Sequence, residues 1–425
     1  MSTILTTSTL PRIPEGLRIK RKGSADHYYV AADLTQRILM SAAGTDLIEG
    51  VLRAGKGFTV QPPNQLYRWT EVYFIVKGEL ELRTGSHTEM LGSHSHVISD
   101  HLSGTTRLTA KTDVKYIHFK TPKIAGEIGK EKQVIESGSG SFRLLFSRSG
   151  KELMIGTVNI NSDIFFKPFQ DELFGTRELY YILEGSLKHS DTQSTFSVQS
   201  DDFVLTDGLE DVVRFTATEP TTYLYFSGVP IFEDIHSLHN DLFELAVQVE
   251  KKDGYTSEHC ARLRTLSIKT GVQLGLNDKS LLILNNGAYL HDIGKLKIPL
   301  DILQKPGELN DAEWNVIKRH PIFGLEILQG TRFSNAGFVV SQHHERMDGS
   351  GYPYGLKGSE IAIESYIVAV ADAFDAMTTD RPYRKALSVE HALREIDKFA
   401  DIHYPRQIVE AFISANTKKN QIHDM

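Results

Sequence analysis

The chain has 425 residues, 40% of them hydrophobic and 24% charged, a composition that excludes a largely disordered or fibrous protein. Its net charge of −7, from 47 basic and 54 acidic residues, argues against a protein held on DNA mainly by electrostatics. The single cysteine, Cys260, rules out a disulfide within the chain, so we expect a protein of the reducing cytoplasm. We expect no membrane partner, because no run reaches the ~18 apolar residues of a spanning helix and residues 1–10 do not resemble a signal peptide.

An internal repeat occupies the first half of the chain. Residues 71–78 (EVYFIVKG) align with residues 178–185 (ELYYILEG), and later positions match at the same offset. Both copies are rich in β-branched and aromatic residues and are interrupted by Gly, Asn, Asp and Ser, which is typical of short strands joined by turns. We therefore predict two tandem small β-barrel modules, at residues 15–125 and 126–230.

The strand pattern of each copy resembles the cupin family. Both copies keep the family's spacing of six residues between a glutamate and a glycine, at Glu71 and Gly78 and again at Glu178 and Gly185. The metal-binding histidines that precede this glutamate in cupins are missing from both copies. The resemblance therefore implies the fold without the metal chemistry, and we expect the modules to sense an unidentified small ligand or to mediate dimerisation.

The periodicity of the apolar residues changes over residues 231–250. Apolar residues recur there in alternating steps of four and three, the a/d pattern of a coiled coil. They are Ile231, Ile235, Leu238, Leu242, Leu245 and Val249. This pattern fits a parallel helix pair in a homodimer, which would connect the β modules to the C-terminal part. It fits equally well an amphipathic helix packed on its own domain.

Histidine and aspartate residues with metal-binding capacity are scattered over residues 244–425. They are His259, His291, Asp292, His320, His343, His344 and Asp372. Adjacent side chains on a helix diverge by about 100°, so ligands to one ion must come from several helices. Five imidazoles and two carboxylates exceed what one ion needs and suit a dinuclear site. This mixed donor set favours Fe, Mn, Zn or Ni over Mg or Ca.

Four longer stretches in the same part resemble the HD-GYP phosphodiesterase family. They are residues 291–295 (HDIGK), 310–321 (NDAEWNVIKRHP), 343–353 (HHERMDGSGYP) and 370–384 (VADAFDAMTTDRPYR). The resemblance implies an all-α bundle of the HD type, over residues 244–425, that hydrolyses cyclic di-GMP. The expected architecture is therefore multidomain, with two β modules followed by a connecting helix and a helical bundle.

The resemblance also implies a role for individual residues. The seven histidines and aspartates are expected to be the metal ligands, with Asp292 bridging two ions. Asp292 and Lys295 are the expected catalytic residues. The expected substrate-binding residues are Lys295, Gly351, Tyr352, Pro353, Arg381 and Arg384. Family members with three metals carry a glutamate four residues before the first histidine, where this chain has Tyr255. We therefore expect two divalent transition ions per chain, Fe or Mn.

The expected activity is that of a bacterial phosphodiesterase that opens cyclic di-GMP to linear pGpG, and the sequence leaves open whether pGpG is cleaved further to GMP. One alternative keeps the reaction and takes 3′,3′-cyclic GMP-AMP as the substrate. Another is a receptor that binds cyclic di-GMP without turnover, and a dNTP-hydrolysing HD enzyme is disfavoured by the Gly-Tyr-Pro loop. In relatives this loop is implicated in contacts with diguanylate cyclase domains, so such a domain is an expected partner.

Overall fold

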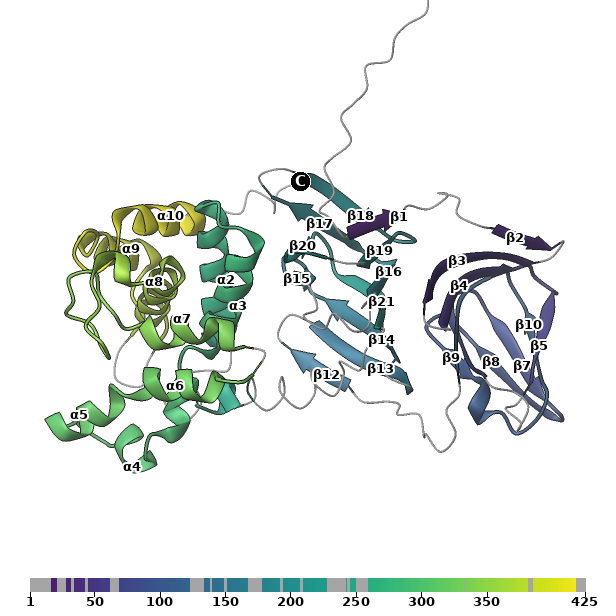
Figure 1. The fold of residues 1–425 in the computed structure, drawn as a ribbon, viewed down its shortest axis with the longest axis horizontal. Helices are drawn as coiled ribbons and strands as arrows, with labels where there is room; N and C mark the ends of the chain where they lie inside the picture. Colours follow the sequence, from purple (N-terminus) through teal and green to yellow (C-terminus); the bar gives the residue numbers. More distant parts are fainter. Residues whose placement is uncertain are drawn as a thin grey trace, which may run out of the picture.

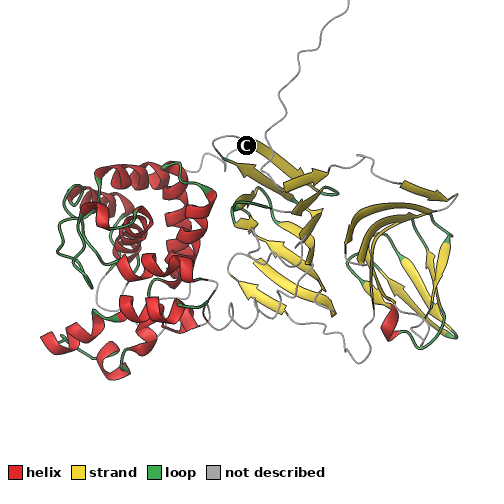
Figure 2. Cartoon of the chain, in the orientation of Figure 1, coloured by secondary structure: helices red, strands yellow, loops and turns green. Residues whose placement is uncertain are grey.

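The structure is a computed structural model of the chain, in which strands and helices occupy different parts of the sequence. The described part before residue 228 consists of strands and one 3₁₀ turn, η1 (Ser99–His101), and the described part from residue 242 onward is helical (Figure 2). The structure describes residues 17–20, 28–31, 34–42, 45–61, 69–122, 134–137, 140–148, 151–166, 178–191, 194–206, 209–227, 242, 245–249, 259–331, 333–380 and 385–417. Three bodies lie in a row, with the second β module between the first module and the helices (Figure 1).

The first β module consists of a six-stranded sheet and a four-stranded sheet. The larger has the order β2-β3-β4-β11-β6-β9 and the smaller β5-β10-β7-β8, and all neighbouring strands are antiparallel. The strands are β2 (Tyr28–Ala31), β3 (Leu34–Ala42), β4 (Thr45–Leu52), β5 (Gly57–Val60), β6 (Trp69–Lys77), β7 (Leu80–Thr84), β8 (His87–Leu91), β9 (His96–Ile98), β10 (Thr106–Ala110) and β11 (Val114–Pro122). Side chains such as Tyr73, Leu108 and Tyr116 pack together and form the core of this module.

The second β module repeats this plan. Its larger sheet has the order β1-β19-β16-β21-β14-β13-β12 and its smaller sheet β15-β20-β17-β18. The strands are β1 (Leu17–Lys20), β12 (Val134–Ser137), β13 (Gly140–Arg148), β14 (Lys151–Val158), β15 (Asp163–Phe166), β16 (Glu178–Glu184), β17 (Ser186–Ser190), β18 (Thr195–Gln199), β19 (Phe203–Thr206), β20 (Val213–Ala217) and β21 (Thr221–Ser227). Successive side chains of a strand point to opposite faces of its sheet, and strand β18 shows this alternation. Phe196 and Val198 are buried, and the residues between and beside them are exposed.

The larger sheets of the two modules pack against each other. Their shared core includes Phe119 of the first module and Phe146 and Phe226 of the second, with ring centroids 5.5 and 5.3 Å from that of Phe119. Strands β6 and β16 are therefore covered on both faces. This explains their nearly continuous apolar sequences, which lack the alternation of a half-exposed strand.

The prediction of two β modules is confirmed, with two differences in detail. The strand pairings among the described residues leave each module as two sheets and do not close it into a barrel. Strand β1 lies within the predicted range of the first module, 15–125, but pairs antiparallel with β19 of the second. It covers an edge of that sheet which would otherwise be open to other chains.

The two glutamates of the cupin-like spacing are buried beside tyrosine hydroxyls. Tyr73 Oη donates to Glu71 Oε2 at 3.1 Å, and Tyr225 Oη donates to Glu178 Oε1. Hydrogen bonds of this kind offset the cost of burying a carboxyl group. The two glutamates therefore have a structural role in the buried sheets that does not require metal-binding histidines.

The helical part is built around α8 (Ile363–Thr378), whose side chains Ile367, Val368 and Val370 lie in the core. The other elements are α2 (His259–Gln273), α3 (Asp278–Leu290), η2 (Ile293–Lys297), α4 (Leu300–Leu303), α5 (Asp311–Ile317), α6 (His320–Leu328), η3 (Ser334–Ala336), α7 (Gly337–Gln342), η4 (Gly358–Glu360), α9 (Val389–Lys398) and α10 (Arg406–Thr417). Among the described helices, none has the length and apolar character needed to cross a membrane.

Most of the expected connecting helix, 231–250, lies outside the described residues. Residues 242 and 245–249 are described and helical. Leu242 and Ala246 are buried in a cluster with Leu290 and Ile293, and Leu245 packs against that cluster. This described part therefore packs on its own domain, which was one of the two arrangements that the periodicity allowed.

Candidate metal centre

The seven predicted ligands come from five different parts of the helical bundle. His259 is the first residue of α2, and His291 and Asp292 directly follow α3. His320 begins α6, His343 and His344 follow α7, and Asp372 lies in α8. Five of these side chains are buried, and His344 and Asp372 are half-buried. The fold therefore brings together residues that lie up to 113 positions apart in the chain, from 259 to 372.

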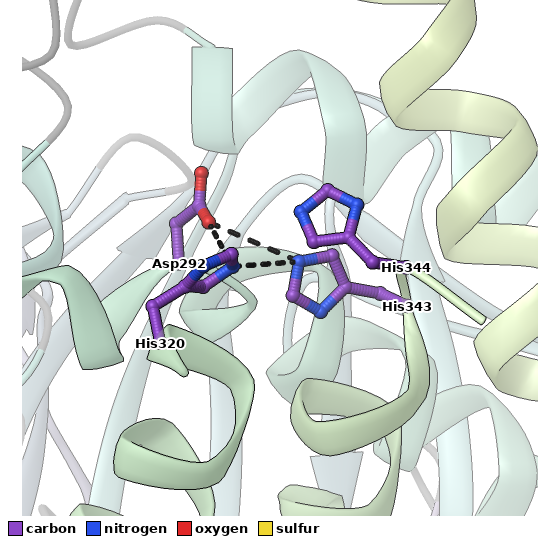
Figure 3. Close-up of side chains that lie close together, drawn as sticks. All are labelled: Asp292, His320, His343 and His344. Carbon is purple, nitrogen blue, oxygen red and sulfur yellow. Dashed lines mark hydrogen bonds and ion pairs between the residues drawn. The ribbon is translucent and has the colours of Figure 1, made fainter. Parts of the chain in front are cut away.

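The ligand atoms form two adjoining groups. Asp292, His320, His343 and His344 form the first group, shown in Figure 3, and His259, His291 and Asp372 form the second. Within each group, one ligand atom per residue lies within 4.8 Å of all the others. A pair of neighbouring groups of this kind matches the dinuclear arrangement expected from the number of donors.

Asp292 lies between the two groups. Its Oδ1 is 3.1 Å from His320 Nε2 and 3.8 Å from His343 Nε2, as the converging side chains in Figure 3 show. Its Oδ2 is 3.2 Å from His291 Nε2, in the second group. One carboxylate thus presents an oxygen to each group, which is the geometry of a bridging ligand.

Backbone carbonyls fix which nitrogen of three histidines faces the centre. The Nδ1 atoms of His291, His320 and His343 lie 3.0, 2.8 and 2.8 Å from backbone carbonyl oxygens. A carbonyl only accepts, so Nδ1 carries the proton and Nε2 is left with a lone pair directed at the centre. This is the arrangement found in histidines that bind metals.

The orientation of these lone pairs supports a cation between them. His320 Nε2 and His343 Nε2 are 3.4 Å apart, and each is an acceptor in this tautomer. Burial, together with nearby histidines, lowers the pKa of His343 and of His344 well below the usual value, so both rings are neutral at pH 7. Two facing lone pairs repel each other unless a positive charge lies between them. The residues therefore fit divalent metal ions.

Lys295 lies beside Asp292, one turn along η2. Its Nζ donates to Asp292 Oδ2 at 2.6 Å. Burial alone would raise the pKa of Asp292, but the Lys295 ammonium group and His291 hold it well below its usual value. Asp292 is therefore an ionised carboxylate, as a bridging ligand must be.

Two residues behind His259 were not predicted from the sequence. Asp375 Oδ2 accepts from His259 Nδ1 at 2.7 Å, and Arg262 Nε donates to Asp375 Oδ1 at 2.6 Å. Burial would raise the pKa of Asp375, but Arg262 and His259 lower it to about 2. The available signal was spacing, because Arg262 and Asp375 each lie three residues after a predicted ligand and hence on the same helix face.

The predicted Gly-Tyr-Pro loop forms a wall of the centre. A Cβ atom at Gly351 would lie 2.6 Å from the carbonyl oxygen of His344 and 2.5 Å from Arg346 N, so only glycine allows this close approach. The Tyr352 ring stacks on His344 at a centroid distance of 4.7 Å. Pro353 is half-buried beside it.

Glu345, which the sequence did not single out, anchors this loop. It is fully buried and accepts hydrogen bonds from Tyr354 N at 2.7 Å and Leu356 N at 3.0 Å. Because it directly follows the two histidine ligands, the same backbone segment carries the ligands and holds the loop. Arg381 and Arg384, the predicted phosphate-binding pair, and Tyr255 lie outside the described residues.

Comparison with known proteins finds a family match in the helical part. Residues 245–408 match the model of the HD domain. The chain is 41% identical over 184 residues to the cyclic di-GMP phosphodiesterase response regulator RpfG of Xanthomonas campestris, covering 43% of this chain and 49% of that protein. It is 41% identical over 167 residues to a cyclic di-GMP phosphodiesterase of Thermotoga maritima, covering 39% of this chain and 45% of that protein.

A third relative acts on a different nucleotide according to its name. The 3′3′-cGAMP-specific phosphodiesterase 3 of Vibrio cholerae is 38% identical over 146 residues, covering 34% of this chain and 32% of that protein. The chain thus spans less than half the length of each of these relatives. The C-terminal part of the chain therefore matches the HD domain model and is similar in sequence to parts of proteins named as cyclic di-GMP phosphodiesterases.

The β modules have cupins among their structural neighbours. These include a cupin 2 conserved barrel domain protein of Leptotrichia buccalis, with a TM-score of 0.35 and 12% identity, covering 47% of this chain and 90% of that one. A second structural neighbour is an oxalate decarboxylase of Lactobacillus farciminis, with a TM-score of 0.32 and 10% identity, covering 50% of this chain and 88% of that one. TM-scores of this size are too low to assign a fold by similarity, so the description of the modules rests on their own strand pairings.

Proposed function

We propose that the protein is a metal-dependent phosphodiesterase that hydrolyses a cyclic dinucleotide, and that cyclic di-GMP is its substrate. The observation that supports this most strongly is the convergence of seven ligand side chains in two groups, with Asp292 of the first group also 3.2 Å from His291 of the second. The names of the Xanthomonas and Thermotoga relatives favour cyclic di-GMP. The name of the Vibrio relative favours 3′,3′-cyclic GMP-AMP as the alternative substrate.

Two divalent transition ions, Fe or Mn, are the proposed cofactors. His259, His291 and Asp372 would hold one ion, and His320, His343 and His344 the other, with Asp292 shared between them. When bound, such a pair lowers the pKa of water toward neutrality and offsets the negative charge that builds up on the phosphate. Imidazole and carboxylate ligands together suit these metals.

Side chains of the protein then orient the substrate and stabilise the negative charge of its phosphates. The ammonium group of Lys295 attracts a non-bridging phosphate oxygen and carries the proton that the leaving 3′ oxygen needs. Tyr352 and the backbone around Gly351 border the centre and limit the positions that a substrate can take. Arg381 and Arg384 are proposed to bind the substrate's phosphates through their forked guanidinium groups.

We also propose that the β modules regulate the enzyme through α3. At the start of this helix, Asp278 Oδ2 accepts from the backbone N–H of Arg214 in β20 at 2.7 Å. The Arg214 side chain lies 3.6 Å from Asp278 Oδ1 and also donates to Asp163 of β15 at 3.1 Å. Phe165 of β15 packs against the core of the helical bundle.

The other end of α3 is held by the segment that links the two halves. Leu290, the last residue of α3, and Ile293 pack with Leu242 and Ala246. These contacts flank His291 and Asp292 on both sides in the sequence. A ligand that shifts the second β module would therefore act on the helix that carries two of the proposed metal ligands.

The other proposed interactions and boundaries rest on the sequence. The limits 15–125, 126–230, 231–250 and 244–425 remain proposals, as do a homodimer, a cytoplasmic location and a small ligand for the β modules. A diguanylate cyclase domain is the proposed partner of the loop at Gly351, Tyr352 and Pro353.

A turnover assay tests the proposed function. The full chain, loaded with Mn or with Fe(II) under anaerobic conditions, would be incubated with cyclic di-GMP and separately with 3′,3′-cyclic GMP-AMP. We expect a linear dinucleotide from cyclic di-GMP at the higher kcat/KM. Preference for the mixed dinucleotide would select the alternative substrate, and tight binding with no hydrolysis would identify a receptor.

A further inference from the structure

An exposed tryptophan lies close to the candidate metal centre. Trp314 is in α5, in a part of the bundle that extends away from the other helices in Figure 1. Its side chain is 42% exposed, although tryptophan is usually largely buried. The chain has one other tryptophan, Trp69, in the first β module.

Aromatic rings connect Trp314 to the proposed ligands. The Trp314 ring centroid lies 6.3 Å from that of Tyr352, with an angle of 71° between the rings. Tyr352 stacks on His344 at 4.7 Å and lies 6.3 Å from His320. Tyr352 therefore lies between the exposed indole and the first ligand group.

The helix that carries Trp314 is held in place by polar contacts. Asn310 caps α5 in a reciprocal arrangement with Glu313, with both hydrogen bonds at 2.9 Å. Lys305 Nζ donates to Glu313 Oε2 at 2.7 Å, which ties α5 to the preceding segment. The Lys318 ammonium group lies 5.8 Å from the centre of the indole ring. The indole is thus presented on a capped helix beside a positive charge.

We propose that Trp314, together with Tyr352, forms a stacking surface for a purine base of the substrate. This inference rests on the proposed function, because a phosphodiester at the metal centre carries its ribose and base to the adjoining wall. Every base has a flat π face, so an indole binds guanine and adenine alike. The Lys318 charge adds attraction for a polyanionic nucleotide. The surface would favour nucleotide diesters over diesters that lack a base.

Kinetics with two kinds of substrate, cyclic dinucleotides and a small diester, test this role. Trp314→Ala and Trp314→Phe would be assayed on cyclic di-GMP, 3′,3′-cyclic GMP-AMP and bis(p-nitrophenyl) phosphate, a diester without a purine. We expect Trp314→Ala to raise KM for the cyclic dinucleotide about tenfold or more, the range typical of one lost base stack. KM for the small diester should stay within twofold of wild type (roughly the scatter of such comparisons), and Trp314→Phe should restore most of the loss.

The matched control is Trp69→Phe, which changes the other tryptophan and should leave both substrates unaffected. An unchanged KM for the dinucleotide in Trp314→Ala would overturn the inference, as would an equal loss on both substrates, which indicates a structural role. A wild-type protein that cleaves the small diester but neither dinucleotide would instead refute the proposed function.

Fluorescence gives a second readout that does not depend on turnover. In the Trp69→Phe variant, Trp314 is the remaining tryptophan and reports on its own environment. We expect cyclic di-GMP to quench its emission in the first milliseconds after mixing, before hydrolysis. Emission that stays constant while the dinucleotide is bound and cleaved would show that the base does not contact the indole.

Discussion

Asp292 is the residue on which the two ligand groups depend. Its two oxygens face His320 and His291 respectively, and Lys295 keeps it ionised. Asn has nearly the same shape but lacks the charge and has only one oxygen. We expect Asp292→Asn to lose bound metal and to lower kcat/KM by more than about a hundredfold, since even second-shell changes reach that size. Metal analysis and turnover would be measured on one preparation.

The control for this change is Asp301→Asn, which removes an exposed carboxylate from α4. It should keep both metal content and activity. Near-normal activity of Asp292→Asn would contradict the assignment of the centre.

Asp375 acts on the centre through His259. It accepts the Nδ1 proton of that ring and is itself held by Arg262. We expect Asp375→Asn to weaken metal affinity by about 10- to 100-fold, because a neutral amide has one acceptor oxygen where the carboxylate offers one each to His259 and Arg262. Competition with a chelator would measure the affinity, and circular dichroism would check the fold. Asp397→Asn, at an exposed position in α9, is the control. Wild-type affinity in Asp375→Asn would show that Asp375 stabilises only the fold.

Among the elements, the loop after α7 requires a glycine at position 351, because the backbone of Glu345 and Arg346 packs closely against it. In Gly351→Ala the new Cβ would meet the backbone of Glu345 and Arg346 at 2.5 Å, and neither atom can move freely. Forced rearrangements of this kind cost about 1–3 kcal/mol. We expect the loop to shift, Tyr352 to leave His344 and kcat/KM to fall. Gly92→Ala is the control, because a Cβ there meets nothing within 4 Å. Unchanged kinetics in Gly351→Ala would refute a role for this loop in shaping the site.

At the scale of the elements, the sequence was sufficient to predict the proposed metal ligands but not the residues that support them. The proposed ligands were predictable because they lie in long, specific stretches at helix ends, such as residues 291–295. Arg262 and Asp375 were missed because a charged residue one turn along a helix usually faces solvent. Their partners become apparent only when α2 and α8 are packed together.

The β part illustrates a second limit. The internal repeat predicted two similar modules. The four residues of β1, however, do not indicate in their sequence that they pair with β19. The apolar pattern of residues 231–250 is likewise the same for a dimer seam and for packing on Leu290. Long-range pairing and the choice between such surfaces depend on the assembled core, which local sequence does not encode.

At the scale of the whole molecule, α3 is held at its start by the second β module and at its end by Leu242 and Ala246. Asp278→Ala would remove the contact with Arg214, while Lys279→Ala, at the next and exposed position, is the matched control. We expect faster hydrogen exchange in α3 and a changed kcat in Asp278→Ala, with bound metal retained. Hydrogen-exchange mass spectrometry and turnover would be compared in the full chain. Identical exchange and kcat in the two variants would contradict coupling through this contact.

The most direct test of the central claim is turnover measured against metal content. The full chain would be stripped with a chelator and reloaded stepwise with Mn or Fe(II), and each sample would be assayed for bound metal and for hydrolysis of cyclic di-GMP. We predict that activity appears as the second ion binds and is maximal at two ions per chain. Full activity with one ion, or saturation with metal and tight binding of cyclic di-GMP without any hydrolysis, would contradict the account.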